Sequence, residues 1–563
     1  MVAPTVVWFR RDLRVHDHAP LREAAAHGPV LPLFILDPAL LHHPETGPAR
    51  VDFLLRSLRA LDHDLKTRGS GLTVRIGEPS AVLAELVREI GASTVMVHSD
   101  CERLVGRVRD ARVAERLGPL GVRLRWFDPP GSTPDLLSHS HWRRLWIASM
   151  AMPILEAPAR LPPPPQSPQG ATRIPSLSAL GLPPSDVPQP EAGTDAARER
   201  LRSFLEDGAS ETYYWQLSEP AARVSSGLSP YLKFGVISPR EVVQRLRGSA
   251  HAHTGPRARR SVGQLLSRLR WAASMHQRFR YLPQLELCSL WSVFDAGGDP
   301  SELEAPLDEA LYAAWREGRT GYPIVDAAAR CLLAEGGWRS LNFRARAIHS
   351  SFLSNLCGID WRYGALHYMR HLIDGDCAID HYQWAMQAGV TDGRPGGWSR
   401  IYHPGQTAVT RCDPHGLFIR RWVPEVAHLT NDQLGEPPPL DGYPAPIVRY
   451  EQCRERREQW LLERRAGIPG HGVGQLARLP QSLRPFAAER FPHAVVDWSE
   501  APGQALHPPA LPLDGLTPEE ERALLSWFPG NRNRVSRRRP PARPARRSSR
   551  RAPAPGQLDL FAL

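Results

Sequence analysis

Tryptophan is the residue in this chain whose chemistry stands out first. The sequence holds 16 tryptophans. An indole ring can stack on a flat cofactor or on a nucleic-acid base, with a gain of roughly 1–3 kcal/mol per stacked base. It can also be oxidised to a radical, so a row of indoles can carry electrons. The alternative is a tryptophan-rich helical core that binds nothing. Nine tryptophans fall in one segment: Trp215, Trp271, Trp291, Trp315, Trp338, Trp361, Trp384, Trp398 and Trp422.

Charged residues in apolar surroundings form a second group. Asp374 and Asp376 flank Gly375 directly after a helix-like segment rich in aromatic residues, and Arg346 lies in another apolar segment. A buried arginine requires a carboxylate partner. We therefore expect Asp374 to pair with Arg346. The alternative for two carboxylates around a glycine is a solvated turn.

A run of hydroxyl-bearing residues could bind phosphate. Serine hydroxyls and main-chain N–H groups at a helix entry are suitable donors to a phosphate group, although a simple helix cap has the same composition. The run consists of Ser225, Ser226, Gly227, Leu228 and Ser229.

Metal ligands are not indicated by the spacing of histidine and cysteine. The pairs His16/His18 and His42/His43 lie in polar segments without a third ligand nearby, so we expect surface side chains and no metal. The seven cysteines are far apart and form no CxxC motif, which predicts reduced thiols rather than disulfides or a four-thiolate iron–sulfur cluster.

Two kinds of structure must position these residues. Apolar runs at 5–37, 94–98 and 122–127 with helical stretches between them predict a Rossmann-like parallel sheet covered by helices. The later tryptophans fall in segments with helical periodicity. The expected order is an α/β domain over 1–150, a Pro-rich linker over 151–196, a helical domain over 197–460, an extension over 461–531 without regular pattern beyond about 500, and a tail over 532–563.

The positive charge is concentrated on that tail. The whole chain carries a formal net charge of +11, and residues 532–551 alone hold ten arginines and no acidic residue. Such a segment is expected to be disordered and to contact nucleic-acid phosphates. The chain has no run of about 18 apolar residues and no signal-peptide pattern at its start, so we expect a cytoplasmic protein without a membrane span.

Five segments together resemble the DNA photolyase/cryptochrome family, and a divergent bacterial branch of it in particular. The resemblance runs from about residue 4 to 455. GRTGYPIVDAAAR, at 318–330, is long enough to be a specific match. The others are VVWFRRDLRVHDHAPL, YLKFGVISPREV, IDWRYGALHYMRHLIDGD and DPHGLFIRRWVPEV.

The resemblance implies an α/β antenna domain followed by an all-α domain that binds FAD. In this family, light-excited reduced FAD gives an electron to a cyclobutane pyrimidine dimer that has been flipped out of the DNA. Trp271 and Asn342 match residues that face the dimer. The residues that match the FAD site are Tyr213, Ser225, Ser226, Gly227, Leu228, Ser229, Arg346, Asp374, Gly375 and Asp376.

Two departures from the family pattern concern substrate and phosphate. Arg268 stands where photolyases of cyclobutane dimers have a glutamate. An arginine can donate to base carbonyls or to DNA phosphate, but it cannot act as a carboxylate. Gly227 stands where the family has an arginine, which implies the loss of one phosphate contact.

Two further departures concern electrons and protons. Asp380 matches the neighbour of flavin N5, where a carboxylate could protonate a flavin radical and favour signalling. Trp384 matches either the flavin-proximal electron donor or a second tryptophan that stacks on substrate. Trp361 matches the middle of the electron chain. No tryptophan occurs around residue 305, where the last member belongs, which predicts a shortened or rerouted chain.

Two functions remain open from the sequence. The first is light-driven repair of pyrimidine dimers, with Arg268, Trp271 and Asn342 contacting DNA. The second is a blue-light photoreceptor without repair activity. An antenna chromophore, a folate or a deazaflavin, is expected in the N-terminal domain. The end of the chain resembles peptides that dock on the bacterial sliding clamp, and the residues concerned are Gln557, Leu558, Asp559, Leu560 and Phe561.

Overall fold

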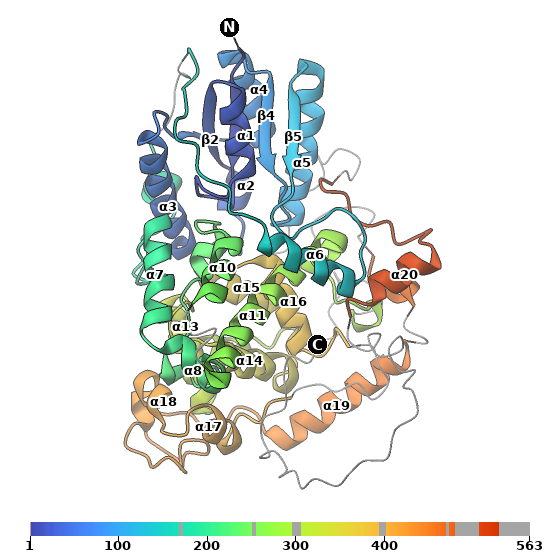
Figure 1. The fold of residues 1–563 in the computed structure, drawn as a ribbon. Helices are drawn as coiled ribbons and strands as arrows, with labels where there is room; N and C mark the ends of the chain where they lie inside the picture. The colour runs from blue at the N-terminus through green and yellow to red at the C-terminus, as the bar shows by residue number, and fades with distance from the viewer. Residues whose placement is uncertain are drawn as a thin grey trace, which may run out of the picture.

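The protein consists of an α/β domain followed by a larger helical domain (Figure 1). The computed structural model describes residues 2–166, 168, 173–249, 255–295, 306–392, 401–468, 472–478 and 506–528. The arginine-rich tail with its terminal motif, Trp398 and the region around residue 305 therefore lie outside the described residues.

A five-stranded parallel sheet forms the centre of the α/β domain, as the sequence predicted. Its order is β3-β2-β1-β4-β5. The strand order reverses between β1 and β4, and ligands of such sheets bind beyond the carboxyl ends of the strands at that point. The strands are β1 (Thr5–Phe9), β2 (Val30–Leu36), β3 (Thr73–Ile76), β4 (Thr94–His98) and β5 (Arg123–Phe127).

Helices with one apolar face cover the sheet. In α4, Leu83, Leu86 and Val87 are buried with one side of the sheet, and the Glu78 side chain caps the helix by accepting from the N–H groups of Ser80 and Ala81. The helices of this domain are α1 (Ala19–His27), α2 (Pro38–Leu41), α3 (Pro48–Lys66), α4 (Pro79–Ile90), α5 (Leu104–Leu117) and α6 (His139–Ala151).

The helical domain follows a segment without strands. Its longest helix, α11, crosses the middle of the domain (Figure 1). The helices are α7 (Thr194–Glu206), α8 (Ala209–Gln216), α9 (Ser229–Lys233), α10 (Pro239–Gly248), α11 (Pro256–Tyr281), α12 (Glu309–Glu317), α13 (Pro323–Glu335), α14 (Phe343–Ser351), α15 (Trp361–His371), α16 (Cys377–Gln387), α17 (Gln406–Cys412), α18 (Leu417–Trp422), α19 (Tyr450–Ala466) and α20 (Pro518–Leu525). Short helical turns are η1 (Gly118–Leu120), η2 (Ser178–Leu180), η3 (Pro220–Ala222), η5 (Pro283–Glu286), η6 (Ser292–Phe294), the π-helical η8 (Phe352–Leu356), η9 (Pro424–Val426) and η10 (Val473–Gln475).

The expectation of an irregular chain beyond residue 500 is wrong for residues 506–528. This segment forms α20, whose first turn is closed by a capping box between Thr517 and Glu520. Trp527, just after the helix, is fully buried. A short helix of eight residues has too few apolar repeats to reveal itself by periodicity, so the capping box was the available signal.

The expectation of surface histidines is wrong for three of the four. His16, His18 and His43 are 7%, 1% and 5% exposed. His18 Nδ1 accepts the N–H of Leu21 at the start of α1, so its Nε2 carries the proton and donates to Asp12 at 2.9 Å. A cation on Nε2 would move the proton to Nδ1, where it would face the N–H of Leu21. His18 is therefore a helix cap rather than a metal ligand.

Membrane insertion is not indicated by the helices. Among the residues that the structure describes, no helix is both long and apolar enough to cross a bilayer.

Candidate functional site

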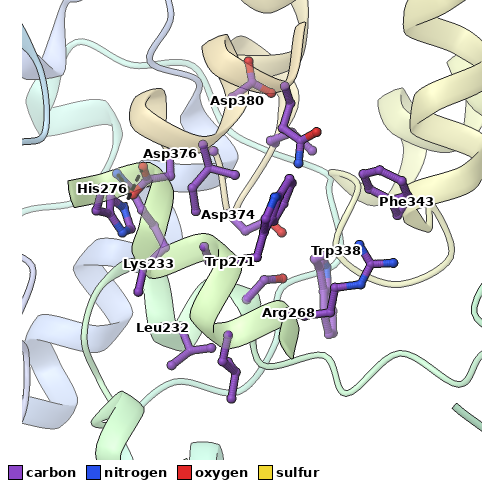
Figure 2. A pocket seen from close by; sticks show the side chains of 18 of the residues that line it. Leu232, Lys233, Arg268, Trp271, His276, Trp338, Phe343, Asp374, Asp376 and Asp380 are labelled. Atoms are coloured by element: carbon purple, nitrogen blue, oxygen red, sulfur yellow. Dashed lines mark hydrogen bonds and ion pairs between the residues drawn. The ribbon is translucent and has the colours of Figure 1, made fainter. Parts of the chain in front are cut away.

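One large cavity lies at the centre of the helical domain and extends to the carboxyl ends of β1 and β4. Its volume is about 580 Å³, within the range of roughly 300–1,000 Å³ that is usual for cofactor and small-molecule sites. Figure 2 shows side chains from α9, α11, α14 and α16 around this space.

Most of the site residues predicted from the sequence line this one cavity. They are Tyr213, Ser225, Ser229, Arg268, Trp271, Asn342, Arg346, Asp374, Gly375, Asp376, Asp380 and Trp384. Ser226, Gly227 and Leu228 do not line it, and Leu228 packs in the hydrophobic core instead. Trp361 is buried outside the cavity lining.

Arg346 and Asp374 lie together, as the sequence predicted. Arg346 Nη2 is 3.6 Å from Asp374 Oδ2, but its shorter bonds run to main-chain carbonyls, from Nη2 to Gly337 at 2.6 Å and from Nε to Leu341 at 3.1 Å. Asp374 Oδ1 is buried without a hydrogen-bond partner among the described residues. This oxygen can accept a hydrogen bond from a ligand in the cavity.

Asp376 connects the two domains. Its carboxylate lies 2.6 Å from Arg11 Nη1 and 3.0 Å from His276 Nε2, and Lys233 Nζ is 3.6 Å away. Burial tends to raise the pKa of Asp376, but the neighbouring His276, Lys233 and Arg11 outweigh it and hold the pKa well below its usual range. No sequence pattern indicated that Arg11, more than 300 residues earlier, would share this site.

The pKa of Asp380 is shifted in the opposite direction to that of Asp376. Asp380 is 9% exposed, and its Oδ2 has no hydrogen-bond partner in the described structure. Burial raises the pKa of Asp380 to about 7, and the nearby carboxylate of Glu45 adds to the rise, while His381 and Arg346 oppose it. Near neutral pH this carboxyl can therefore both hold and release a proton inside the cavity.

Aromatic rings lead away from the cavity at Trp384. The ring of Trp384 lies edge-on to Trp315 with centroids 5.9 Å apart, and Trp315 stacks on Tyr312 at 6.0 Å. Trp361 lies 6.0 Å from the ring of His381. From the sequence, Trp315 was only one of nine candidate tryptophans, because nothing in its local pattern distinguishes it from a core residue.

Arg268 and Trp271 both project from α11 into the cavity (Figure 2). The Arg268 guanidinium lies over the Phe343 ring at 4.9 Å, and the Trp271 ring is edge-on to the same phenylalanine at 6.4 Å. Burial lowers the pKa of Arg268, although Tyr213 partly offsets it. A half-buried indole and a desolvated cation thus share one wall of the cavity.

Both polar atoms of the Asn342 side chain form hydrogen bonds within the protein. Its Oδ1 caps α14 by accepting the N–H of Ala345 at 2.9 Å, and its Nδ2 donates to the carbonyl of Leu217 at 3.1 Å. It lines the cavity while doing so.

Comparisons with known proteins identify relatives along most of the chain. A family model described as DNA photolyase matches residues 5–129, and one described as FAD binding domain of DNA photolyase matches residues 265–462. A curated deoxyribodipyrimidine photo-lyase of a Synechococcus species is 35% identical over 498 residues, which cover 83% of this chain and 98% of the relative. Cryptochrome-1 of Arabidopsis thaliana is 29% identical, over 85% of this chain and 74% of its own. The crystal structure of a class III photolyase from Agrobacterium tumefaciens superimposes with a TM-score of 0.71 at 28% identity, over 83% of this chain and 98% of that one.

Proposed function

The chain belongs to the DNA photolyase/cryptochrome family, and from this we propose that it repairs cyclobutane pyrimidine dimers in DNA with blue light. One observation carries the proposal. The cavity combines the lining of a flavin site with a stacking face, Trp271, and a cation, Arg268, on its wall. Flat bases that have left the duplex require such a face.

The residues present fit an FAD molecule. The unpartnered oxygen of Asp374 can accept from a flavin ring N–H group, and Ser225 and Ser229 offer hydroxyls where a pyrophosphate would lie. Tyr213 adds a phenol whose pKa burial raises, so it stays protonated and can donate. FAD bound there would supply, in its reduced and light-excited form, the electron for splitting the dimer.

The chain's own residues orient substrate and exclude water. Trp271 offers its ring to a base, and Arg268 offers guanidinium donors to base carbonyls or to the phosphate between the two bases. Asp380 Oδ2 can hold a proton in the same cavity without losing a protein hydrogen bond. Burial of these groups strengthens each contact, because water does not compete for it.

The test is direct repair. Purified protein loaded with FAD is mixed with an oligonucleotide that contains one thymine dimer, reduced, illuminated with blue light, and assayed for intact thymines by chromatography. We expect light-dependent loss of the dimer, and little loss with a Trp271→Ala variant that retains flavin. A fully reduced, DNA-bound protein that leaves every dimer intact would contradict repair.

A photoreceptor role is the second candidate, and Asp380 is the observation that favours it. A carboxyl with a pKa of about 7 can deliver a proton into the cavity at physiological pH. If signalling is the function, the light-induced absorption change of the bound flavin should depend on pH with a midpoint near 7 and lose that dependence in Asp380→Asn. Repair activity would then be absent in both proteins.

We also infer where an antenna chromophore would bind, at a second and much smaller cavity beside the sheet, which can take only part of such a molecule. This cavity has a volume of about 100 Å³ and lies at the carboxyl ends of β1 and β2. Arg50, 7% exposed, lines it, and its Nη2 is buried without a partner among the described residues. A ring system with carbonyl or anionic edges, such as a folate or a deazaflavin, would satisfy this donor. Heat-released chromophores, identified by absorption and mass, should include one besides FAD, and Arg50→Met should lose it while keeping FAD.

DNA and the sliding clamp are the partners we infer for the tail. Its ten arginines can hold DNA phosphates, with binding that weakens steeply as salt rises. The sequence QLDLF at 557–561 has the polar and apolar anchors of a clamp-docking peptide. Tail and motif would act on one clamp–DNA complex in the cytoplasm and gain from effective concentration. The test titrates a 552–563 peptide against purified clamp, with Leu560→Ala/Phe561→Ala as the control, and equal binding of the two peptides would contradict docking.

A further inference from the structure

The phosphate loop, residues 225–229, contains a glycine in the left-handed conformation whose side-chain space is already filled. Gly227 has φ +66°, and a Cβ built there would lie 2.8 Å from Arg200 Nε and 3.4 Å from Arg200 Cζ. The space beside the glycine is therefore filled by a guanidinium that comes from another element, α7.

Arg200 holds the main chain of this loop. Its Nε donates to the carbonyl of Ser226 at 2.8 Å, and its Nη2 donates to the carbonyl of Ser225 at 3.2 Å. The helix behind it is fixed, because Ala197, Leu201 and Phe204 of α7 are buried in the core. Arg200 does not line the cavity, so it grips the loop from the outer side while Ser225 and Ser229 face inward.

We propose that Arg200 is a positioning residue for the phosphate-binding loop, an inference that rests on the proposed FAD binding. In a trans peptide the C=O and N–H bonds point in opposite directions. Holding the carbonyl of Ser226 outward therefore turns the N–H group of Gly227 away from Arg200, and this N–H donates to Ser225 Oγ at 3.4 Å. Arg200 thus acts through Ser225, the residue of this pair that lines the cavity, by orienting its hydroxyl. A Cβ at Gly227 would push against the guanidinium that holds this arrangement.

The experiment measures flavin affinity, not activity. Apoprotein is titrated with FAD and with riboflavin, which lacks phosphates, by quenching of flavin fluorescence. Arg200→Met should weaken FAD binding about tenfold, as expected for loss of a charge-assisted contact, and leave riboflavin binding unchanged. Arg202→Met, an exposed arginine of the same helix that pairs with Glu199, is the matched control and should change neither.

A double-mutant cycle tests the pairing of Arg200 with Gly227. Gly227→Ala alone should weaken FAD binding, and it should cost less in an Arg200→Met background, where the contact with the guanidinium is gone and only the backbone strain at φ +66° remains. Equal losses of FAD and riboflavin affinity, or no loss of either, would overturn the role of Arg200. If the unmodified apoprotein bound riboflavin as tightly as FAD, both the proposed cofactor and the role of Arg200 would be overturned.

A second, independent observation concerns residues 506–528, which follow the family-matched residues and contact both domains. At one end, the His507 ring lies 4.0 Å from the ring of Trp126 in β5. At the other, Trp527 packs on Trp142 at 5.2 Å and on Tyr281 at 5.6 Å. Residues 506–528 thus run from strand β5 of the sheet to the C-terminal end of α11.

Two buried arginines use this segment as their acceptor. Arg107 of α5 is fully buried, and its Nε donates to the carbonyl of Pro508 at 2.9 Å. Arg278 of α11 is 4% exposed, and its Nη2 donates to the carbonyl of Trp527 at 2.9 Å. Burial lowers the pKa of both, that of Arg107 to about 10. Arg107 Nη1 also donates to the carbonyls of Phe279 and Arg280, both at 3.2 Å, so only its Nε and Nη2 depend on this segment for a protein acceptor.

We infer that residues 506–528 form a clasp that locks the sheet domain to α11, the helix that carries Arg268 and Trp271. Two truncated proteins test this inference. A protein that stops after residue 528 should melt like the full chain, whereas one that stops after residue 505 should melt roughly 5–10 °C lower and release flavin faster. Equal melting of the two truncated proteins would overturn the clasp.

Arg107→Met gives the sharper result, because its effect should depend on the clasp. In the full chain it removes a buried cation whose Nε and Nη2 donate to the carbonyl of Pro508, and it should lower the melting temperature. In the protein that stops after residue 505, water reaches these two nitrogens and Nη1 keeps the carbonyls of Phe279 and Arg280, so the substitution should lower the melting temperature much less. Equal losses in both backgrounds would show that Pro508 is not the acceptor that matters.

Discussion

Replacement of Asp380 by asparagine should change stability in a way that depends on pH. The pKa of Asp380 is about 7 in the folded protein, against roughly 3.9 in an unfolded chain. A carboxyl whose pKa is raised by folding stabilises the protein only when protonated. Its penalty is therefore absent below about pH 4, grows as pH rises through the interval from about 4 to 7, and is complete above about pH 8.

The size of the effect follows from the shift. Three pKa units at about 1.4 kcal/mol each give a penalty on the order of 4 kcal/mol at alkaline pH. Asparagine keeps the shape and cannot ionise, so Asp380→Asn should exceed the parent in stability by up to that amount at pH 8.5 and nearly match it at pH 4.5. Arg346 and His381 face Asp380 and favour its charged form, and their effect is already contained in the raised pKa.

The assay is the difference in unfolding free energy between parent and variant, measured with denaturant at several pH values. Taking the difference cancels the titrating groups that do not interact with Asp380, so that of the buried histidines only His381, which faces it, contributes. The matched control is Asp374→Asn, which changes a carboxyl of the same cavity without altering the length of the side chain. A difference between parent and Asp380→Asn that stays constant from pH 4.5 to 8.5 would refute the raised pKa.

Three other predictions concern the cavity. Asp374→Ala should release flavin but lower the free energy of unfolding by less than about 1 kcal/mol. The cost is small because Arg346 is 28% exposed and already donates to two carbonyls. A large loss of stability with flavin retained would contradict this. Trp315→Phe should slow photoreduction of oxidised flavin at least as much as Trp361→Phe, while chemically reduced enzyme repairs normally in both; an effect confined to Trp361→Phe would assign the electron path to that residue. Trp271→Ala should weaken binding of dimer-containing DNA by roughly 1–3 kcal/mol with flavin retained, as filter binding can measure, and unchanged affinity would make it a core residue.

Sequence patterns identified the features that depend on local order. The strands at 94–98 and 122–127 were recognisable because a buried parallel strand is a short apolar run, and the structure places both. The pair of Arg346 with Asp374 could be predicted, because an arginine in an apolar segment requires an anion. β3, with only four residues, was too short to be recognised.

The remaining features depend on contacts between distant segments. His18 lies in a polar stretch, and only the fold shows that Asp12 and the start of α1 satisfy both of its nitrogens. The Asp376 carboxylate is shared by Arg11 and His276, which no spacing along the chain could indicate. Gly227 was read as a lost phosphate contact, whereas the structure shows that a guanidinium from α7 occupies its side-chain space.

Repair requires a substrate-binding surface in the cavity, and signalling requires a proton donor there. The two residues that could provide these, Arg268 and Asp380, lie on different helices. Arg268, on α11, shares a wall with Trp271, where a base would stack, and a cation there favours a substrate that carries carbonyls or phosphate. Asp380, on α16, holds an exchangeable proton near neutral pH. Because the two groups act on different partners, Asp380→Asn should leave dimer binding unchanged, and Arg268→Met should leave the pH dependence of the flavin spectrum unchanged. If either substitution altered both properties, substrate and proton would compete for one site, and the cavity could not serve repair and sensing independently.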